Sequence, residues 1–122
     1  VASIVLRRGF GLGAMAMTAG HFHAPVATAA WPAAEFGPMG LEGAVRLGFR
    51  KELAAVPEAE RQALFERLLG QARERGQALN MASHLEIDDV IDPADTRSWL
   101  LRVLTVAGTK NLPPRRPFVD TW

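Results

Sequence analysis

The 122-residue chain contains no cysteine, which excludes disulfide bonds, thiolate metal sites and a cysteine nucleophile. Charges of the two signs nearly balance, with 14 basic and 13 acidic residues. We therefore expect neither a nucleic acid nor a membrane surface as a partner. No run of about 18 apolar residues is present, so no membrane-spanning helix is expected. These absences favour one small domain in a reducing compartment such as the cytoplasm.

The N-terminus has no initiator methionine and none of the basic start and apolar stretch of a signal peptide. The chain begins with Val1, inside what reads as a strand. We therefore expect this sequence to be a piece of a longer protein. Its hydrophobic faces would then need partners outside the piece.

Hydrophobic periodicity predicts short strands first and long helices later. The strands are predicted at 2–6, 26–31, 35–36 and 87–91, the last with two aspartates. The helices are predicted at 13–19, at 41–55, from Pro57 to near Gly76, and after the cap residue Asp92. The final helix should bury Trp99, Leu100, Val103, Leu104 and Val106. Residues 80–86 are ambiguous, and prolines predict an extended tail over 110–122. This order of elements predicts a mixed α/β domain.

Residues 4–17 are the most informative segment, because a strand leads into a glycine-rich turn and a short helix of small residues. Glycine lets a ligand approach the backbone closely. The helix start then offers unpaired N–H groups to a negatively charged oxygen. A second turn of this kind, at 36–43, precedes the next helix. The two turns predict a site built from backbone amides.

The same segment also matches the dinucleotide-binding fingerprint formally, as Gly9-x-Gly11-x-x-Ala14 with Glu35 at about the expected distance. The fingerprint requires a long helix, whereas Gly20 interrupts this one after barely two turns. A nicotinamide- or flavin-dependent oxidoreductase is therefore an alternative that the interrupted helix disfavours. A glycine turn without any ligand also stays open.

The histidines do not complete a metal site in the sequence. His21 and His23 would share one face of an extended stretch, but a metal needs a third and a fourth ligand. His84 and Glu35 are the distant candidates, and no pattern joins them to the pair. We therefore expect no metal.

Two further groups of residues each allow two interpretations. An acidic run could hold a carboxylate pair for acid–base chemistry, but we favour a helix cap beside a solvated or Arg97-paired strand edge. That run comprises Glu86, Asp88, Asp89 and Asp92. The methionines near the glycine turns either fill the core or line an acyl pocket. They are Met15, Met17 and Met39.

Five stretches match one known family in order and spacing: 6–17 (LRRGFGLGAMAM), 30–32 (AWP), 35–45 (EFGPMGLEGAV), 87–93 (IDDVIDP) and 96–97 (TR). Through them the chain resembles the carboxyltransferase (β) subunit of biotin-dependent acyl-CoA carboxylases of the propionyl-, methylcrotonyl- and acetyl-CoA type. The resemblance covers essentially the whole chain. It corresponds to the C-terminal part of that subunit, which agrees with the expected missing start.

The resemblance implies a crotonase-like (ClpP/crotonase) ββα superhelix, with residues 1–109 as the C-terminal part of the carboxyltransferase C-domain. It implies transfer of a carboxyl group from carboxybiotin to the α-carbon of an acyl-CoA. Biotin would arrive on a carrier domain associated with a biotin carboxylase subunit. Family members form hexamers, in which the N-domain of a neighbouring subunit holds the thioester enolate. The C-domain turn holds the biotin ureido oxygen.

By alignment with the family, the backbone amides of Leu12 and Gly13 would form the biotin oxyanion hole. Phe10, Gly11 and Met15 would lie beside it as substrate-binding residues. Many relatives carry Gly-Gly-Ala at positions 11–13, so the Leu12 side chain must point away from biotin. Relatives that favour propionyl-CoA tend to carry aspartate at the Met15 position, so Met15 implies a tolerant acyl pocket. A non-catalytic assembly piece of the subunit is the alternative.

Overall fold

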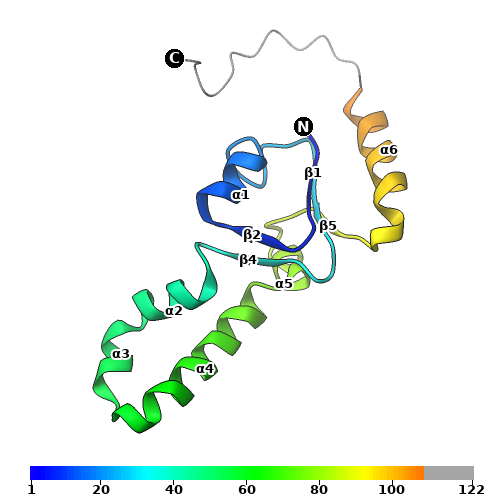
Figure 1. Cartoon of the computed structure of the whole chain (residues 1–122). Helices are drawn as coiled ribbons and strands as arrows, with labels where there is room; N and C mark the ends of the chain where they lie inside the picture. The colour runs from blue at the N-terminus through cyan, green and yellow to red at the C-terminus, as the bar shows by residue number, and fades with distance from the viewer. Residues whose placement is uncertain (109–122) are drawn as a thin grey trace, which may run out of the picture.

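The computed structural model describes residues 1–108 (Figure 1). The predicted tail at 110–122 lies outside these residues. The strands are β1 (Ser3–Val5), β2 (Arg8–Phe10), β3 (Thr28–Ala30), β4 (Glu35–Gly37) and β5 (Asp89–Val90). The helices are α1 (Gly11–Met17), α2 (Leu41–Gly48), α3 (Arg50–Ala55), α4 (Glu58–Arg75), α5 (Ala78–Ser83), the 3-10 turn η1 (Pro93–Asp95) and α6 (Thr96–Ala107). Among these, no helix has both the length and the apolar character needed to cross a bilayer.

The strands form two small parallel sheets in a repeating pattern. One sheet has the order β1-β3-β5, and β2 pairs with β4 in the other. The units β1–β2–α1 and β3–β4–α2 are therefore successive turns of a ββα superhelix, with equivalent strands side by side. Parallel neighbours need such crossover connections, because a tight hairpin can join only antiparallel strands. The predicted mixed α/β class is confirmed.

Strand β2 lies inside the segment that the sequence indicated as a turn. Its residues pair with β4 in the register Arg8–Glu35, Gly9–Phe36 and Phe10–Gly37. Three residues centred on a glycine carry too little strand propensity to be recognised locally. The pairing comes from a long-range contact, and it brings the start of α1 forward to Gly11 from the predicted Gly13.

The long helices follow the sequence with one interruption. The predicted helix at 41–55 is broken into α2 and α3 at Phe49, directly after Gly48. Helix α4 begins after Pro57 and ends at Arg75, with Gly76 as its C-cap, which confirms the predicted end near Gly76; Pro57 is the N-cap and not the first helical residue. Helix α5 (Ala78–Ser83) begins before the ambiguous segment 80–86 and includes its first half. Asp92 caps the final helical segment as predicted, since its Oδ1 accepts a hydrogen bond from the Ala94 N–H at 2.8 Å.

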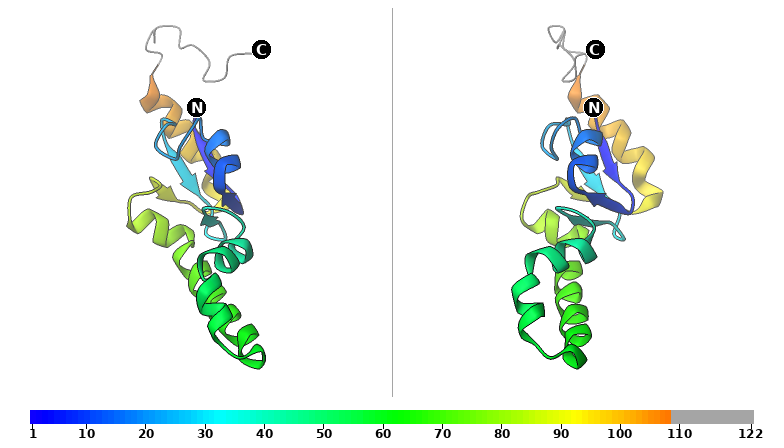
Figure 2. Two further views of the ribbon diagram at one scale, coloured as in Figure 1. Left: turned by 90° about the vertical axis from the view of Figure 1, so that its left-hand side faces the viewer. Right: turned by 60° about the vertical axis from the view of Figure 1, so that its left-hand side comes forward.

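Three hydrophobic clusters make up the core of the described residues. The sheet cluster is formed by Ala30, Ala34, Phe36, Ala78 and Ile87. The hairpin cluster, formed by Leu41, Val45, Leu53, Phe65 and Leu69, holds α2, α3 and α4 together. The third cluster joins α6 to the strands through Ala29, Ile91 and Trp99. The hairpin of α2, α3 and α4 extends from one end of the strands, and α6 lies beside them toward the other end (Figure 2).

Helix α6 buries a narrower stripe than its spacing predicted. Trp99 is 5% exposed, and Leu100 and Val103 pack partly against it. Leu104 and Val106 are 62% and 85% exposed, so the prediction that they are buried is wrong for this structure. The third cluster contacts one side of the helix, and the last turn of α6 runs past the end of the strands (Figure 1). Helical spacing identifies an apolar face but not how far a neighbour extends along it.

Candidate amide site at the start of helix α1

The candidate site is the amino end of α1, where β2 turns into the helix. Gly11 has a φ of +57°, and a Cβ there would lie 2.8 Å from the carbonyl oxygen of Pro38. A side chain at this position would be strained and would also collide with a neighbouring backbone, so glycine is required. Gly11 thus holds the start of α1 against the loop that leads into α2.

Leu12 and Gly13 follow in the first turn of α1, at the surface. Within residues 1–108 no side chain caps the helix, and first-turn N–H groups have no acceptor within a helix. Leu12 is 82% exposed, and a Cβ at Gly13 would meet nothing within 4 Å. The first turn also contains no acidic residue. The two amides are therefore accessible to a negatively charged oxygen, which the helix dipole favours.

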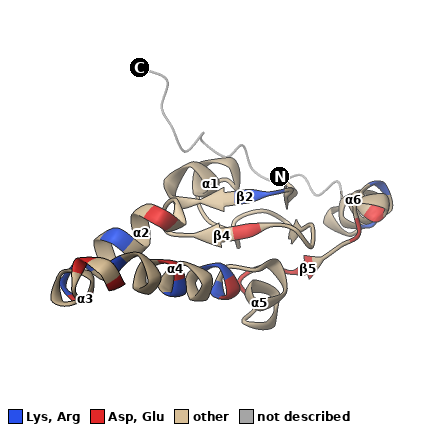
Figure 3. Ribbon diagram, turned by 60° about the horizontal axis from the view of Figure 1, so that its bottom comes forward, with Lys and Arg blue, Asp and Glu red and all other residues tan. Residues whose placement is uncertain are grey.

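The second glycine turn, before α2, lies beside the turn before α1, but the helix that follows it carries a charged residue in its first turn. Phe10 pairs with Gly37, so the two helix starts are neighbours. The first turn of α2 contains Glu42, whose carboxylate lies 3.5 Å from the Arg73 guanidinium. Figure 3 shows α1 without charged residues and α2 with both signs. A ligand anion at α2 would meet a like charge, so the start of α1 suits an oxyanion better.

Helix α1 lies between two cavities. One, of about 720 Å³, is bounded by β1 and β2 and includes Phe10 and Gly13 among its lining residues. The other, of about 690 Å³, is lined by Gly11, Leu12 and Met15 on its α1 side. The structure therefore gathers all five predicted site residues around α1, on two sides of it. Phe10 also packs against the hairpin cluster.

The second cavity, which we call the apolar cavity, has walls that the sequence did not indicate. Residues of β4, α2, α4 and α5 close it opposite α1. Helical and strand periodicity marks these residues as core, but only the packing of distant elements turns them into a wall. Met15 is 40% exposed and lies among the lining residues of this cavity.

The structure does not support the dinucleotide-binding alternative. Its fingerprint requires a long helix packed on the strand, whereas α1 has seven residues. Glu35, which would have to reach a ribose, lies in β4 opposite Arg8. Its N–H donates to the carbonyl of Arg7 at 2.7 Å, so the residue contributes to the β2–β4 connection.

The histidines have separate local contacts. His23 Nε2 lies 3.9 Å from the Glu86 carboxylate, and the rings of His21 and His23 are 6.1 Å apart. His84 Nδ1 lies 2.8 Å from the carbonyl oxygen of Asn80. Within residues 1–108, no three His, Asp or Glu side chains come together as metal ligands.

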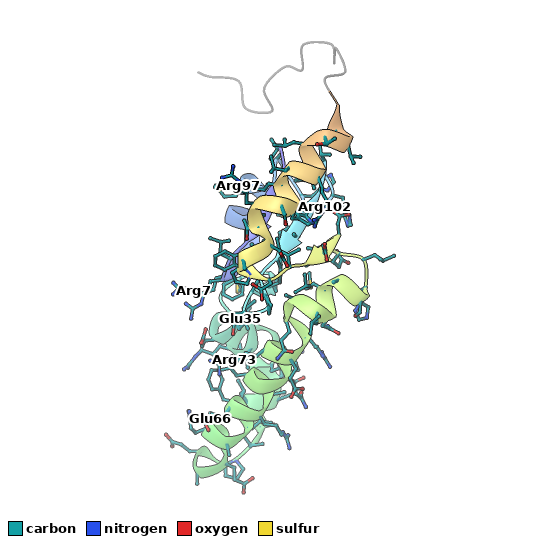
Figure 4. The ribbon with its side chains drawn as sticks, turned by 90° about the vertical axis from the view of Figure 1, so that its right-hand side faces the viewer. Arg7, Glu35, Glu66, Arg73, Arg97 and Arg102 are labelled. Carbon is teal, nitrogen blue, oxygen red and sulfur yellow. The ribbon has the colours of Figure 1, made fainter. Side chains whose placement is uncertain are left out.

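The acidic run around β5 has structural partners. The Asp88 carboxylate accepts a hydrogen bond from the Thr28 N–H at 2.7 Å, and the Asp88 N–H donates to the Thr28 carbonyl at 2.8 Å. In the described part of the chain, Arg73 pairs with Glu42 and His23 lies near Glu86, so the expected pairing of Arg97 with this run does not form. Figure 4 shows Arg97 pointing outward from α6.

Sequence comparisons identify relatives of the whole chain. A match to the carboxyl transferase domain family covers residues 1–118. The chain is 39% identical over 114 residues to the methylmalonyl-CoA carboxyltransferase 12S subunit of Propionibacterium freudenreichii subsp. shermanii, covering 88% of this chain and 20% of that subunit. It is 35% identical over 117 residues to the biotin-dependent acetyl-/propionyl-CoA carboxylase β6 subunit of Mycobacterium tuberculosis, covering 91% and 24%. The chain thus spans about a fifth to a quarter of these relatives.

Solved structures have the same architecture. A single-chain, multi-domain long-chain acyl-CoA carboxylase matches with 54% identity and a TM-score of 0.66, over 83% of this chain and 10% of that one. The transcarboxylase 12S hexamer with bound methylmalonyl-CoA matches with 30% identity and a TM-score of 0.81, over 98% and 23%. The ββα superhelix is therefore the crotonase-like fold of carboxyltransferase domains. The family match covers residues 1–118, and the fold and the glycine-rich segment agree with it. The chain therefore belongs to the carboxyl transferase domain family.

Proposed function

We propose that this chain contributes the biotin-side oxyanion hole of a carboxyltransferase that moves a carboxyl group from carboxybiotin to the α-carbon of an acyl-CoA. The observation that carries the proposal is the uncapped, accessible and uncharged start of α1. The amides of Leu12 and Gly13 donate to the negative charge that develops on the ureido oxygen. Such preorganised donors stabilise charge without rearranging during the reaction. Bound biotin supplies the ureido group that carries the carboxyl.

The residues at the start of α1 fit the ureido group of biotin. The donors are backbone amides, and the space beside Gly13 is open. Leu12 lines the apolar cavity, which supports the requirement that its side chain points away from the ureido ring. Gly11 keeps the donors in place by its contact with the backbone of Pro38.

The remaining parts of the enzyme lie outside this chain in our proposal. The N-domain of a neighbouring subunit in a homo-hexamer supplies the thioester half of the site. A biotin carboxyl carrier and a biotin carboxylase subunit deliver the carboxyl group, and the assembly works in the cytoplasm. Two relatives support this arrangement: the 12S structure is described as a hexamer, and the β6 subunit belongs to a biotin-dependent carboxylase.

The chain alone is expected to carboxylate no acyl-CoA. Holding both substrates together supplies much of the rate, and half of a site cannot do so. The measurement is incorporation of labelled bicarbonate into acetyl-, propionyl- and butyryl-CoA with biotin carboxylase and carrier present. Adding the N-terminal part of the subunit should restore activity. Turnover by the chain alone contradicts the proposal. If the restored activity does not change when Gly13 is substituted, the chain has a purely structural role in assembly.

Replacing Met15 with aspartate in the complete protein is expected to shift selectivity among acetyl-, propionyl- and butyryl-CoA. Met15 lines the apolar cavity beside the amide donors, so a carboxylate there changes the pocket that faces the acyl group. One methylene in such a pocket is worth about 1–3 kcal/mol, so ratios of kcat/KM should change by about 10–200-fold. The matched control is Met17→Asp, because Met17 lines the opposite cavity. Equal ratios in both variants and the wild type would remove Met15 from the acyl site.

A further inference from the structure

Two buried polar residues flank the connection between α1 and β3 (residues 18–27). They are Thr18 and Thr28, which are 3% and 0% exposed. The connection leads from the far end of α1 back to the strands (Figure 2). A buried hydroxyl is costly unless it forms a hydrogen bond, so its partner shows which segments it holds together. The two threonines therefore indicate how the helix with the candidate donors is fixed at its far end.

Thr18 closes the carboxyl end of α1 through local contacts. Its hydroxyl lies 3.0 and 3.1 Å from the carbonyl oxygens of Ala14 and Met15. The next residue, Ala19, has a φ of +59°, and the Gly20 N–H donates back to the Met15 carbonyl at 2.8 Å. These contacts end the helix and turn the chain. They do not fix the helix relative to the strands, so that task falls to a contact farther along the chain.

Thr28 supplies this longer contact. Its hydroxyl donates to the carbonyl oxygen of Phe22 at 2.6 Å, which ties the middle of the connection to β3. Thr28 is itself held from the β5 side, because its N–H donates to the Asp88 carboxylate at 2.7 Å. Its carbonyl also accepts a hydrogen bond from the Asp88 N–H at 2.8 Å. All the polar groups of Thr28 are thus engaged, and the sheet holds the hydroxyl that holds the connection.

Phe22 transmits this contact toward the amide site. Its ring meets the Phe36 ring edge to face, with 5.3 Å between the centroids. Phe36 pairs with Gly9, just before the turn at Gly11. Phe22 also lines the apolar cavity together with Gly11 and Leu12. A shift of Phe22 would therefore change the packing around the first turn of α1.

We propose that Thr28 is a positioning residue for the amide donors of α1. The inference rests on the proposed function and adds to it a fully buried residue, which can act only through its neighbours. Its hydroxyl fixes the Phe22 backbone and thereby the connection that holds the far end of α1. Oxyanion donors work because they are held in place before the reaction, and a misplacement of about 1 Å can lower a rate by about 10²-fold.

The test replaces Thr28 in the complete carboxylase that contains this chain. Thr28→Val keeps the shape of the side chain and Thr28→Ala makes it smaller, so neither a clash nor a gap explains an effect that both share. Each should lower kcat of carboxyl transfer by about tenfold, less than the loss of a whole donor, and change KM for the acyl-CoA by less than about threefold. Thr28→Ser keeps the hydroxyl and should restore kcat to within about threefold of the wild type.

The matched control is Thr105→Val on α6. It removes a threonine hydroxyl of the same kind, which donates to the Leu101 carbonyl at 2.8 Å at an exposed position. This variant should keep the kcat and KM of the wild type, because α6 does not contact the connection through this hydroxyl.

Amide exchange gives a second measurement that does not need activity. The Gly20 and Ala24 N–H groups form hydrogen bonds inside the connection, to the carbonyls of Met15 and His21. Their exchange should become about tenfold faster in the valine and alanine variants and return in the serine variant, since one net hydrogen bond is worth about that factor. Exchange at Leu53 in the helical hairpin should stay unchanged.

The outcomes separate this proposal from the proposed function. Wild-type kcat or unchanged exchange in both variants without the hydroxyl overturns the proposal. An equal loss in the serine variant, or a fall in kcat that comes with loss of assembly, also overturns it and leaves Thr28 as part of the core. Absence of carboxyl transfer in the wild type overturns the proposed function itself, and exchange then decides separately whether Thr28 anchors the connection.

Discussion

Replacing Gly13 with proline in the complete protein is expected to lower kcat of carboxyl transfer by about 10²–10³-fold, the usual loss for one oxyanion donor. Proline has no N–H, yet it is tolerated in the first turn of a helix, where that N–H has no partner within the helix. Gly13 lies in the first turn of α1, and the space around it is open. The change therefore removes a donor at a position where a Cβ meets nothing within 4 Å. Steady-state kinetics with carboxybiotin and acyl-CoA give the measurement.

The control for this variant is Gly13→Ala, which keeps the N–H and adds a methyl group where nothing lies within 4 Å. Its loss in kcat should be less than about tenfold, far below that of one missing donor. Because the proline ring also restricts Leu12, circular dichroism and the oligomeric state must match the wild type. A well-assembled proline variant with normal turnover would show that the Gly13 amide is not an oxyanion donor.

Replacing Gly76 with alanine is expected to destabilise the docking of the helical hairpin on the strands by about 3 kcal/mol or more, the upper part of the range for overpacking. A Cβ at Gly76 would collide with the carbonyl oxygen of Phe36, which is backbone and cannot rotate away. The contact also contains a hydrogen bond in which the Phe36 N–H donates to the Gly76 carbonyl at 2.8 Å. Thermal unfolding and amide exchange at Phe36 in the complete protein measure the loss.

The matched control lies six residues earlier on the same helix. Gly70 sits inside α4, and a Cβ added there would meet nothing within 4 Å. Gly70→Ala should therefore stabilise the helix by about 0.5–1 kcal/mol, because alanine loses less backbone entropy. The two substitutions are chemically identical and are expected to have opposite signs. A Gly76→Ala protein as stable as the wild type would mean that α4 does not dock on β4 through this contact.

The candidate amide site could be proposed from the sequence because its signals are local. The pattern Gly11-Leu12-Gly13 places a turn before a helix, and unpaired N–H groups belong to every helix start. The same local chemistry identified the Asp92 cap and the end of α4 at Gly76. The role that we propose for these amides comes from the resemblance to a family, because periodicity alone could not supply it.

Other features follow from contacts between residues far apart in the sequence. Strand β2 exists because β4 pairs with it, and a three-residue strand has no periodicity of its own. The exposure of Leu104 and Val106 depends on where the strands beneath α6 end. The apolar cavity likewise needs α1, β4, α2, α4 and α5 in one place. Propensity and spacing act within about one turn or one strand, so the sequence by itself determined the long helices, the Asp92 cap and the candidate donors of the proposed site. The short strand β2 and the walls around α1 were decided only when distant elements packed together.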